Sequence, residues 1–238
     1  MKATKAKSIL DFKNILVEEG LNEMDKNMSF VSKVVGKKCE AIFPTIDAEL
    51  LESDRYITLS TLYTLKPKEY VVLVPGSSAS YKMWPLEKMA AIADYCIEKG
   101  YTVILLGSKS EKMLGDRIVK LSKHPQNCIN LIGETNLASL VHMVKNAKFY
   151  FGNDTGTLHI AASVTTPAIA VMGGGHFKRF FPYGNLHINR IIFDKNMHCK
   201  NDAWECAKTV PAGSPSPCIR SIEVEDAIKE IDSLLTTL

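Results

Sequence analysis

Short continuous apolar runs alternate with longer amphipathic segments from residue 70 to residue 193. The run YVVLV (70–74) precedes the loop PGSSAS, which is the pattern of a strand buried on both faces of a parallel sheet. Segment 85–100 then has apolar residues at helical spacing, with Pro85 near its start and Gly100 at its end. This order predicts a strand followed by a helix.

The same alternation continues along the chain. Further strands are predicted at 102–107, 128–131, 148–151, 167–172 and 190–193, and helices at 110–122, 136–147, 156–163 and 224–235. Such alternation predicts an α/β fold with right-handed crossovers. We expect a Rossmann-like, doubly wound parallel sheet of about six strands within a domain at 67–238.

The first 66 residues have a different pattern. Two helical stretches are predicted at about 8–19 and 22–36, and 39–69 has isolated apolar groups without a sheet pattern. We interpret 1–66 as a helical lead-in, a remnant of a region between domains, and not as a second domain.

Composition and charge narrow the class of protein. With 238 residues, 46% hydrophobic and 23% charged, the chain is globular and neither disordered nor fibrous. A net charge of +3 gives no argument for a nucleic-acid partner and does not oppose a phosphorylated ligand or an anionic membrane surface. No apolar stretch reaches the roughly 18 residues of a membrane span, and the N-terminus lacks the features of a signal peptide. We therefore expect a cytoplasmic protein.

Four loops that follow predicted strands have the composition of ligand-binding loops. In an open parallel sheet, ligands bind beyond the carboxyl ends of the strands. The loops PGSSASYKMWP, GSKSE, GNDTG and GGGHFKR lie there and are rich in Gly, Ser and Thr, which suits a phosphate. No G-x-G-x-x-G follows the first strand and no P-loop is present, which argues against a dinucleotide-dependent dehydrogenase.

The motif at 154–159 places polar residues at a predicted helix start. The amides of Thr155 and Gly156 lie where a helix N-terminus favours an anion, and Asp154 can cap the helix or accept a sugar hydroxyl. His159 follows Thr155 by four residues, so it lies on the same helix face and leans toward the same end. Simple capping and a structural histidine are the alternatives.

The loops after the first two strands supply further candidates. Lys82, with the hydroxyls of Ser77, Ser78 and Ser80, can neutralise a pyrophosphate, although a solvated lysine is the alternative. Glu111 lies where such sheets hold a ribose hydroxyl, and it also fits the first turn of a helix without any ligand. A basic group after the fifth strand can serve a second anion or can be exposed: His176, Lys178 and Arg179.

Three of the six cysteines lie in a late loop rich in Gly, Pro and Ser. Cys199, Cys206 and Cys218, with His198, can offer four soft ligands to zinc. Their spacing lacks C-x-x-C, so we expect reduced thiols and no metal site.

Taken together, these loops resemble a known family. PGSSASYKMWP, GYTVILLGSKSE, GNDTGTLHIAAS and CIRSIEVEDAIKEI are similar to the C-terminal half of glycosyltransferase family 9, the ADP-heptose:lipopolysaccharide heptosyltransferases. The elements K-x-W-P and D-[ST]-G-x-x-H, in that order, are fairly specific as a pair. The resemblance extends from about residue 20 onward.

The resemblance implies a two-domain GT-B fold in which the C-terminal domain holds the sugar nucleotide. It implies transfer of a heptose from an ADP-linked donor to a lipid-linked, lipopolysaccharide core-type saccharide at the membrane surface, without a cofactor or a required metal. The positions that match donor-binding residues are Ser77, Ser78 and Lys82 at the phosphates, Glu111 and Thr135 at the nucleoside, and Asp154, Thr155, Gly156 and His159 in the donor motif.

One part of the family pattern has no counterpart here. Family members begin with an α/β domain whose Gly-Asp loop supplies the proposed base, whereas Gly115-Asp116 lies inside a predicted helix. We therefore assign no catalytic residue and expect donor binding with little turnover unless a missing domain or a second copy is supplied. A non-catalytic nucleotide-binding or partner-binding module and a GT-B-type sugar-nucleotide epimerase remain the alternatives.

Overall fold

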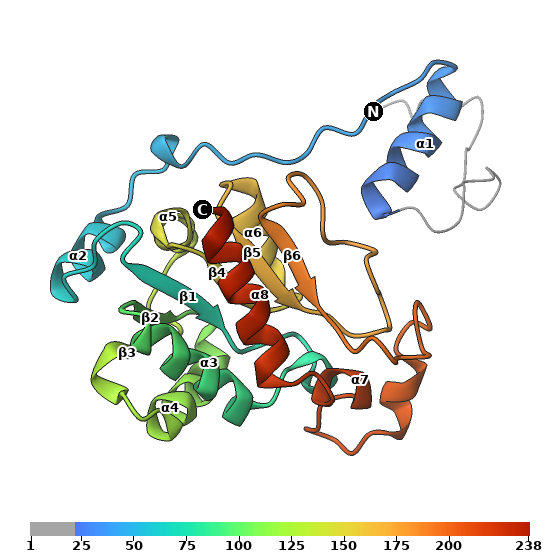
Figure 1. Ribbon diagram of the computed structural model, residues 1–238. Helices are drawn as coiled ribbons and strands as arrows, with labels where there is room; N and C mark the ends of the chain where they lie inside the picture. The colour runs from blue at the N-terminus through green and yellow to red at the C-terminus, as the bar shows by residue number, and fades with distance from the viewer. Residues whose placement is uncertain (1–21) are drawn as a thin grey trace, which may run out of the picture.

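A computed structural model describes residues 22–238 as one six-stranded sheet covered by helices on both faces (Figure 1). The strand order is β3-β2-β1-β4-β5-β6, and every neighbouring pair is parallel. The strands are β1 (Tyr70–Val74), β2 (Thr102–Leu105), β3 (Cys128–Asn130), β4 (Tyr150–Asn153), β5 (Ala168–Val171) and β6 (Asn189–Ile192). The predicted doubly wound α/β sheet is confirmed.

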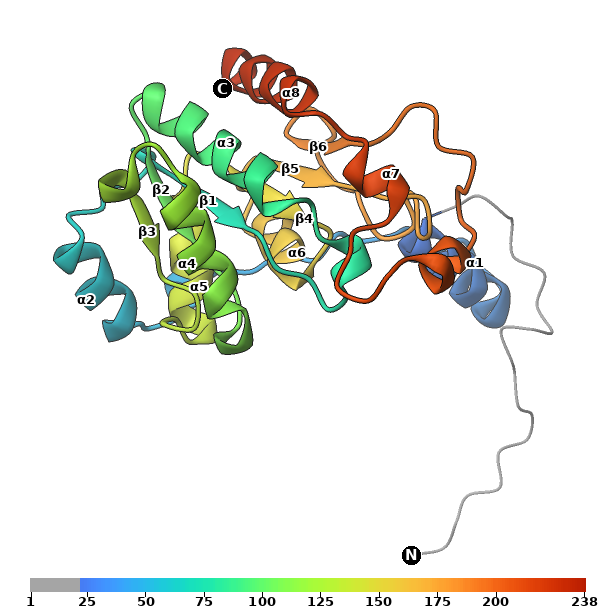
Figure 2. The same cartoon turned by 90° about the horizontal axis from the view of Figure 1, so that it is seen from below.

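The helices divide between the two faces of the sheet (Figure 2). One face is covered by α3 (Leu86–Glu98), α4 (Lys112–Leu121), α7 (Pro217–Arg220) and α8 (Val224–Thr237). The other is covered by α2 (Asp54–Leu62), α5 (Leu137–Asn146) and α6 (Gly156–Ser163). Short 3₁₀ helices lie at Ala48–Leu50, Ser80–Lys82, Lys109–Glu111, Pro125–Asn127 and Glu205–Thr209.

Strand β1 shows why these runs are continuously apolar. All five of its residues are buried: Val71 and Leu73 face the α3 side, whereas Tyr70, Val72 and Val74 face the α5 side. Successive side chains of a strand point to opposite faces, so a strand covered on both faces needs apolar residues at every position.

The predicted limits of β4 are wrong by two residues. We expected 148–151, but the strand extends through Gly152 and Asn153, both buried. Lys148 and Phe149 still hydrogen-bond β1 before the strand begins. A small residue and an amide resemble a loop in the sequence, whereas here they continue a central strand.

The lead-in contains more packed structure than its sequence suggests. The predicted helix at 22–36 is present as α1 (Glu23–Val35), and the one at 8–19 lies outside the described residues. Within 39–69, however, α2 begins after Ser53, whose hydroxyl caps the Tyr56 amide at 3.1 Å. Leu59 and Ala48 are buried in the same apolar cluster as β1. Few residues of segment 39–69 reach the core, and its sequence therefore carries few apolar residues.

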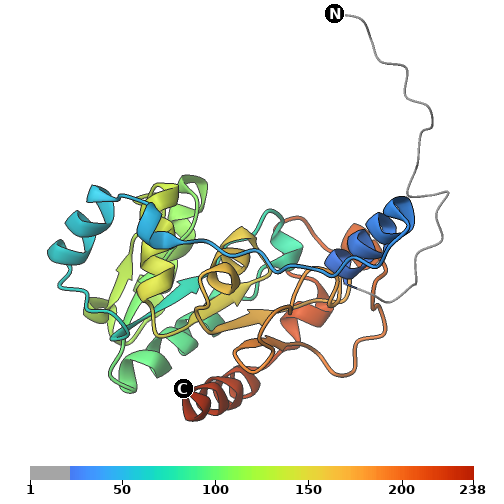
Figure 3. The same ribbon diagram turned by 90° about the horizontal axis from the view of Figure 1, so that it is seen from above.

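Segment 36–53 connects α1 to α2 as an extended stretch with one 3₁₀ turn, and it runs along the α6 and α5 side (Figure 3). The Ile46 amide donates to Ser163 O at 3.0 Å, which fixes the stretch to α6. At its other end, α1 is held by the Glu23 amide on Arg179 O at 2.7 Å and by a 2.8 Å ion pair between the same two residues. Both ends of the connection therefore contact the sheet domain.

The strand order determines where a ligand can enter. β1 and β4 are neighbours, yet the helices that follow them, α3 and α6, lie on opposite faces. The loops after the two strands therefore diverge at their carboxyl ends, and in open α/β sheets ligands bind at this point, which we call the crevice between β1 and β4.

The close contact between β1 and β4 should make Gly152 intolerant of any side chain. A Cβ at Gly152 would lie 2.6 Å from Val74 O, a backbone atom that cannot move freely. We expect Gly152→Ala to lower the free energy of unfolding by about 1–3 kcal/mol in urea titrations. Gly156→Ala is the matched control, because a Cβ there meets no atom within 4 Å. Equal stability of the two variants would contradict this packing.

Candidate functional site

Asn153 ties together the two loops that border the crevice. Its side chain, fully buried at the end of β4, accepts a hydrogen bond from the Trp84 amide at 3.0 Å. Its Nδ2 donates to Pro75 O at 2.7 Å and to Gly76 O at 3.2 Å. Asn153 was not predicted from the sequence, where its place between Gly152 and Asp154 is the sign of this role. The loop after β1 is therefore held directly against the start of the 154–159 motif.

Asp154 is a partly buried carboxylate at the start of the 154–159 motif. Within residues 22–238, no group donates a hydrogen bond to its side chain. Burial raises its pKa, while the positive charges of His159, Lys82 and His176 act in the opposite direction. These bases come from α6 and from the loops after β1 and β5, so three elements converge on one acid.

The first turn of α6 is not capped by side chains. Thr155 is the N-cap residue, but its hydroxyl makes no capping bond and instead lies 3.5 Å from the Tyr150 hydroxyl. In the described chain, the amides of Gly156 and Thr157 have no acceptor. Simple capping by Asp154 or Thr155 is therefore contradicted, and these amides point their positive ends into the crevice.

His159 is fixed by an aromatic neighbour. Its Nδ1 lies 3.1 Å from the Tyr183 hydroxyl, and the two rings stack with centroids 5.7 Å apart. Tyr183 also stacks on Phe43 at 5.9 Å. Burial lowers the pKa of His159, opposed by the nearby Asp154 charge. The histidine has a structural partner and still lies beside the acid, so the two interpretations from the sequence do not exclude each other.

Lys82 lies over the ring of Trp204, with Nζ 5.5 Å from the centroid. Trp204 is 7% exposed and packs on the glycine run after β5. A Cβ at Gly175 would lie 2.3 Å from Trp204 Cδ2, and one at Gly173 would lie 2.5 Å from Cη2. These glycines are therefore needed to admit the indole, a packing role that the sequence analysis did not anticipate.

The serines of the loop after β1 differ in exposure. Ser77 Oγ is buried without a hydrogen-bond partner, whereas Ser78 is exposed. A buried hydroxyl without a partner is costly, and bound ligands commonly satisfy such groups. Ser77 therefore has a free hydroxyl beside the crevice.

Glu111 forms a capping box before α4. Its Oε2 accepts bonds from the amide and the hydroxyl of Ser108, both at 2.7 Å. A Cβ at Gly76 would lie 1.9 Å from Oε1, so this oxygen approaches the loop after β1. The helix-start interpretation is confirmed, and Oε1 remains on the crevice side.

Thr135 lies in the loop after β3, on the carboxyl side of the sheet. Among the described residues, no hydrogen bond joins it to the other candidate residues. The adjacent Glu134 pairs with Arg55 and Lys112, both at 2.9 Å. Thr135 is therefore peripheral to the group around Asp154.

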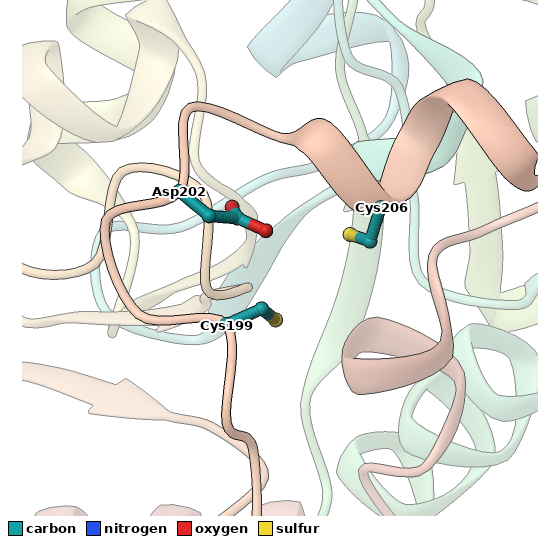
Figure 4. A group of neighbouring side chains, drawn as sticks. All are labelled: Cys199, Asp202 and Cys206. Atoms are coloured by element: carbon teal, nitrogen blue, oxygen red, sulfur yellow. The ribbon is translucent and has the colours of Figure 1, made fainter.

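The late loop brings two of its cysteines together with an aspartate (Figure 4). One ligand atom from each of Cys199, Asp202 and Cys206 lies within 4.8 Å of the others. His198 is exposed and outside this group, whereas Asp202, which the sequence analysis did not name, belongs to it. All six cysteines of the chain are free thiols.

A separate hollow of about 700 Å³ lies between α1 and the extended segment that follows it. Met28, Ser32 and Phe43 are among its lining residues, and none of the candidate donor residues lines it. It belongs to the connection between the lead-in and the domain.

The strand order, with helices on both faces of the sheet, defines a Rossmann-like α/β domain. The family model of glycosyltransferase family 9 (heptosyltransferase) matches residues 2–208. The chain therefore belongs to this family, and the resemblance seen in its motifs is confirmed.

Individual relatives agree with the family match. The chain is 38% identical over 88 residues to lipooligosaccharide heptosyltransferase 2 of Haemophilus ducreyi, covering 36% of this chain and 25% of that protein. It is 29% identical over 128 residues to lipopolysaccharide heptosyltransferase 2 of Escherichia coli, covering 52% of this chain and 37% of that protein. It therefore matches about a quarter to a third of these relatives' lengths.

The fold agrees with a solved structure, that of E. coli ADP-heptose lps heptosyltransferase II. The TM-score is 0.66 at 22% identity, over 83% of this chain and 55% of the other. The described helices include none that is long and apolar enough to cross a membrane.

Partial burial of the Asp154 carboxylate, which raises its pKa, should make the free protein less stable at neutral pH than it could be. Because burial raises this pKa, the acid stabilises the fold when protonated, and that contribution is lost as pH rises through the folded pKa. We expect Asp154→Asn to raise the free energy of unfolding by about 0.5–2 kcal/mol at pH 7.5. The gain should shrink as pH falls toward the ordinary aspartate pKa.

Urea titrations at several pH values measure this difference. The exposed carboxylate of Glu40 provides a matched control, and Glu40→Gln should change little. A loss of stability in Asp154→Asn at pH 7.5 would show that the charged carboxylate is satisfied within the free chain.

Proposed function

We propose that this chain is the donor-binding part of a heptosyltransferase and holds ADP-heptose in the crevice between β1 and β4. The observation that carries this proposal is the partly buried carboxylate of Asp154, which lacks a hydrogen-bond donor in the described chain and lies near basic groups from three elements. A sugar nucleotide offers hydroxyl donors for the acid and a diphosphate for the bases.

The diphosphate would lie between Lys82 and the start of α6. The uncapped amides of Gly156 and Thr157 and the free hydroxyl of Ser77 can donate to phosphate oxygens. Trp204 restrains the ammonium of Lys82, which lowers the entropy lost on binding. With these groups meeting the diphosphate charge, we propose that binding needs no separate cofactor.

The heptose would lie at Asp154 and His159. The carboxylate can accept bonds from sugar hydroxyls, and the imidazole, whose pKa burial lowers, can also hydrogen-bond a sugar hydroxyl. Tyr183 fixes the ring through Nδ1, which leaves the opposite ring nitrogen for the ligand.

The nucleoside would extend toward β2 and β3. Glu111 Oε1 lies against the Gly76 loop, where it can accept ribose hydroxyls, and Thr135 lies at the next loop along the sheet. The names of similar proteins support ADP-heptose as the donor, since the solved E. coli relative is described as an ADP-heptose transferase.

We propose a lipopolysaccharide core-type, lipid-linked saccharide as the acceptor, met at the inner face of the cytoplasmic membrane. Transfer requires a base for the acceptor hydroxyl and a surface that aligns it with the donor carbon. The crevice residues are assigned to the donor, so a second domain or a second copy would supply that surface.

Calorimetry with ADP and UDP tests the donor site. We expect saturable ADP binding that exceeds UDP binding. Removing one charge-assisted bond costs about 1.5–3 kcal/mol, so Asp154→Ala, His159→Ala and Lys82→Ala should weaken ADP-heptose binding by roughly 10- to 150-fold. Lys120→Ala, which removes an exposed lysine on α4, is the control.

The alternatives give different results. No binding of either nucleotide would reject the donor site, whereas UDP preference would reject the adenine assignment. Binding unaffected by all three crevice variants would place the nucleotide elsewhere.

Turnover tests the need for an acceptor-binding surface. We expect this chain alone to bind ADP-heptose without acceptor-dependent ADP release, because the crevice residues are assigned to the donor and none is left to take the proton of the acceptor hydroxyl. A coupled ADP assay with a lipid-linked core saccharide measures this, with E. coli heptosyltransferase 2 as the positive reference. Acceptor-dependent release by the chain alone would contradict the requirement for a second domain.

A further inference from the structure

A group of sulfur and carboxylate ligands lies in the long loop between β6 and α7, outside the proposed donor contacts. Cys199, Asp202 and Cys206 direct one sulfur or oxygen each toward a common point (Figure 4). Apart from the 3₁₀ helix at Glu205–Thr209, residues 193–216 contain no helix or strand. Such a long stretch inside a packed domain requires interactions of another kind to fix it.

Cys218, at the start of α7, supplies a fourth candidate ligand. Its sulfur accepts a bond from the Gly174 amide at 3.5 Å. A Cβ at Gly174 would lie 2.7 Å from the Cys199 sulfur. The two sulfurs therefore lie against the same glycine, and Cys199 lies between Cys206 and Cys218.

The dimensions suit a tetrahedral ion. Zinc binds sulfur at about 2.3 Å and carboxylate oxygen at about 2.0–2.2 Å, which places neighbouring ligand atoms roughly 3.3–3.8 Å apart. The three atoms within 4.8 Å of one another need only small side-chain adjustments to reach that separation.

The backbone around the cluster is held in an uncommon shape. Asn201, Ala203 and Trp204 have positive φ values of 61°, 53° and 67°. The Trp204 amide donates to Asp202 Oδ1 at 3.0 Å, which orients the carboxylate and leaves its second oxygen for a cation. This strained turn brings Asp202 to the two cysteines that flank it in sequence.

We propose that Cys199, Asp202, Cys206 and Cys218 bind one structural zinc ion. Three thiolates and a carboxylate are ligands that zinc accepts in closed four-coordinate sites. The thiols lose their protons on binding, and the ion compensates the negative charge that results.

The zinc would fix the wall of the crevice as well as the loop. Trp204 lies between Asp202 and Cys206 in sequence and packs on Gly173 and Gly175. Because Lys82 lies over the same indole, a site that anchors this turn also sets the position of that lysine. None of the four zinc ligands is a proposed donor contact, so zinc binding does not depend on the donor assignment.

Elemental analysis of the chain, purified without chelators, tests the site. We expect about one zinc per chain in the wild type and at least a tenfold lower zinc content in Cys206→Ser and Asp202→Asn. Cys39→Ser is the matched control, since Cys39 lies near α1 and its thiol bonds Lys37 O. The control should retain the wild-type zinc content.

Co²⁺ titration of chelator-treated wild-type chain provides a second measurement that does not depend on how the variants fold. A stoichiometric thiolate-to-cobalt charge-transfer band is expected, and zinc should displace it. A wild-type chain without zinc and without this band would overturn the proposal, as would a disulfide among the three cysteines or stoichiometric iron in place of zinc. A wild-type chain that contains zinc but does not bind ADP would count against the donor site and not against the zinc site.

Discussion

The buried amide of Asn153 is the interaction on which the crevice depends. One side chain binds the backbone of the loop after β1 at three points and does so from the end of β4. The two strands are adjacent, but their chains leave toward opposite faces, so nothing in the sheet itself fixes the distance between the two loops. The amide supplies this restraint, and Ser77, Lys82 and the start of α6 take their relative positions from it.

Around this restraint, the crevice holds polar groups that the free chain leaves unsatisfied. The Asp154 carboxylate, the Ser77 hydroxyl and the first amides of α6 lack partners within the described chain. Each costs stability, and a ligand that carries both phosphates and hydroxyls satisfies all of them together. Under the proposed function, the same arrangement therefore accounts both for a loss of stability in the free chain and for the preference for such a ligand.

The alternation of apolar runs was enough to predict the sheet, because strands buried on both faces leave a strong signal. Helix α2 was missed because only residues such as Leu59 reach the core, so the helix has little apolar periodicity. That Asp154 and His159 lie close together could be predicted from their spacing at a helix start. Asn153, Trp204 and Asp202 could not, since their roles depend on contacts between segments about 30 to 70 residues apart or on a turn with positive φ. The glycines after β5 had a phosphate-loop composition but proved to accommodate an indole.

The aromatic stack of Phe43, Tyr183 and His159 gives the lead-in an influence on the crevice. Phe43 belongs to the extended segment, Tyr183 to the loop after β5, and His159 to α6. A displacement of the extended segment removes one face of support from Tyr183, and Tyr183 is the partner that orients the histidine. The position of the extended segment and the orientation of the His159 ring therefore depend on each other through Tyr183.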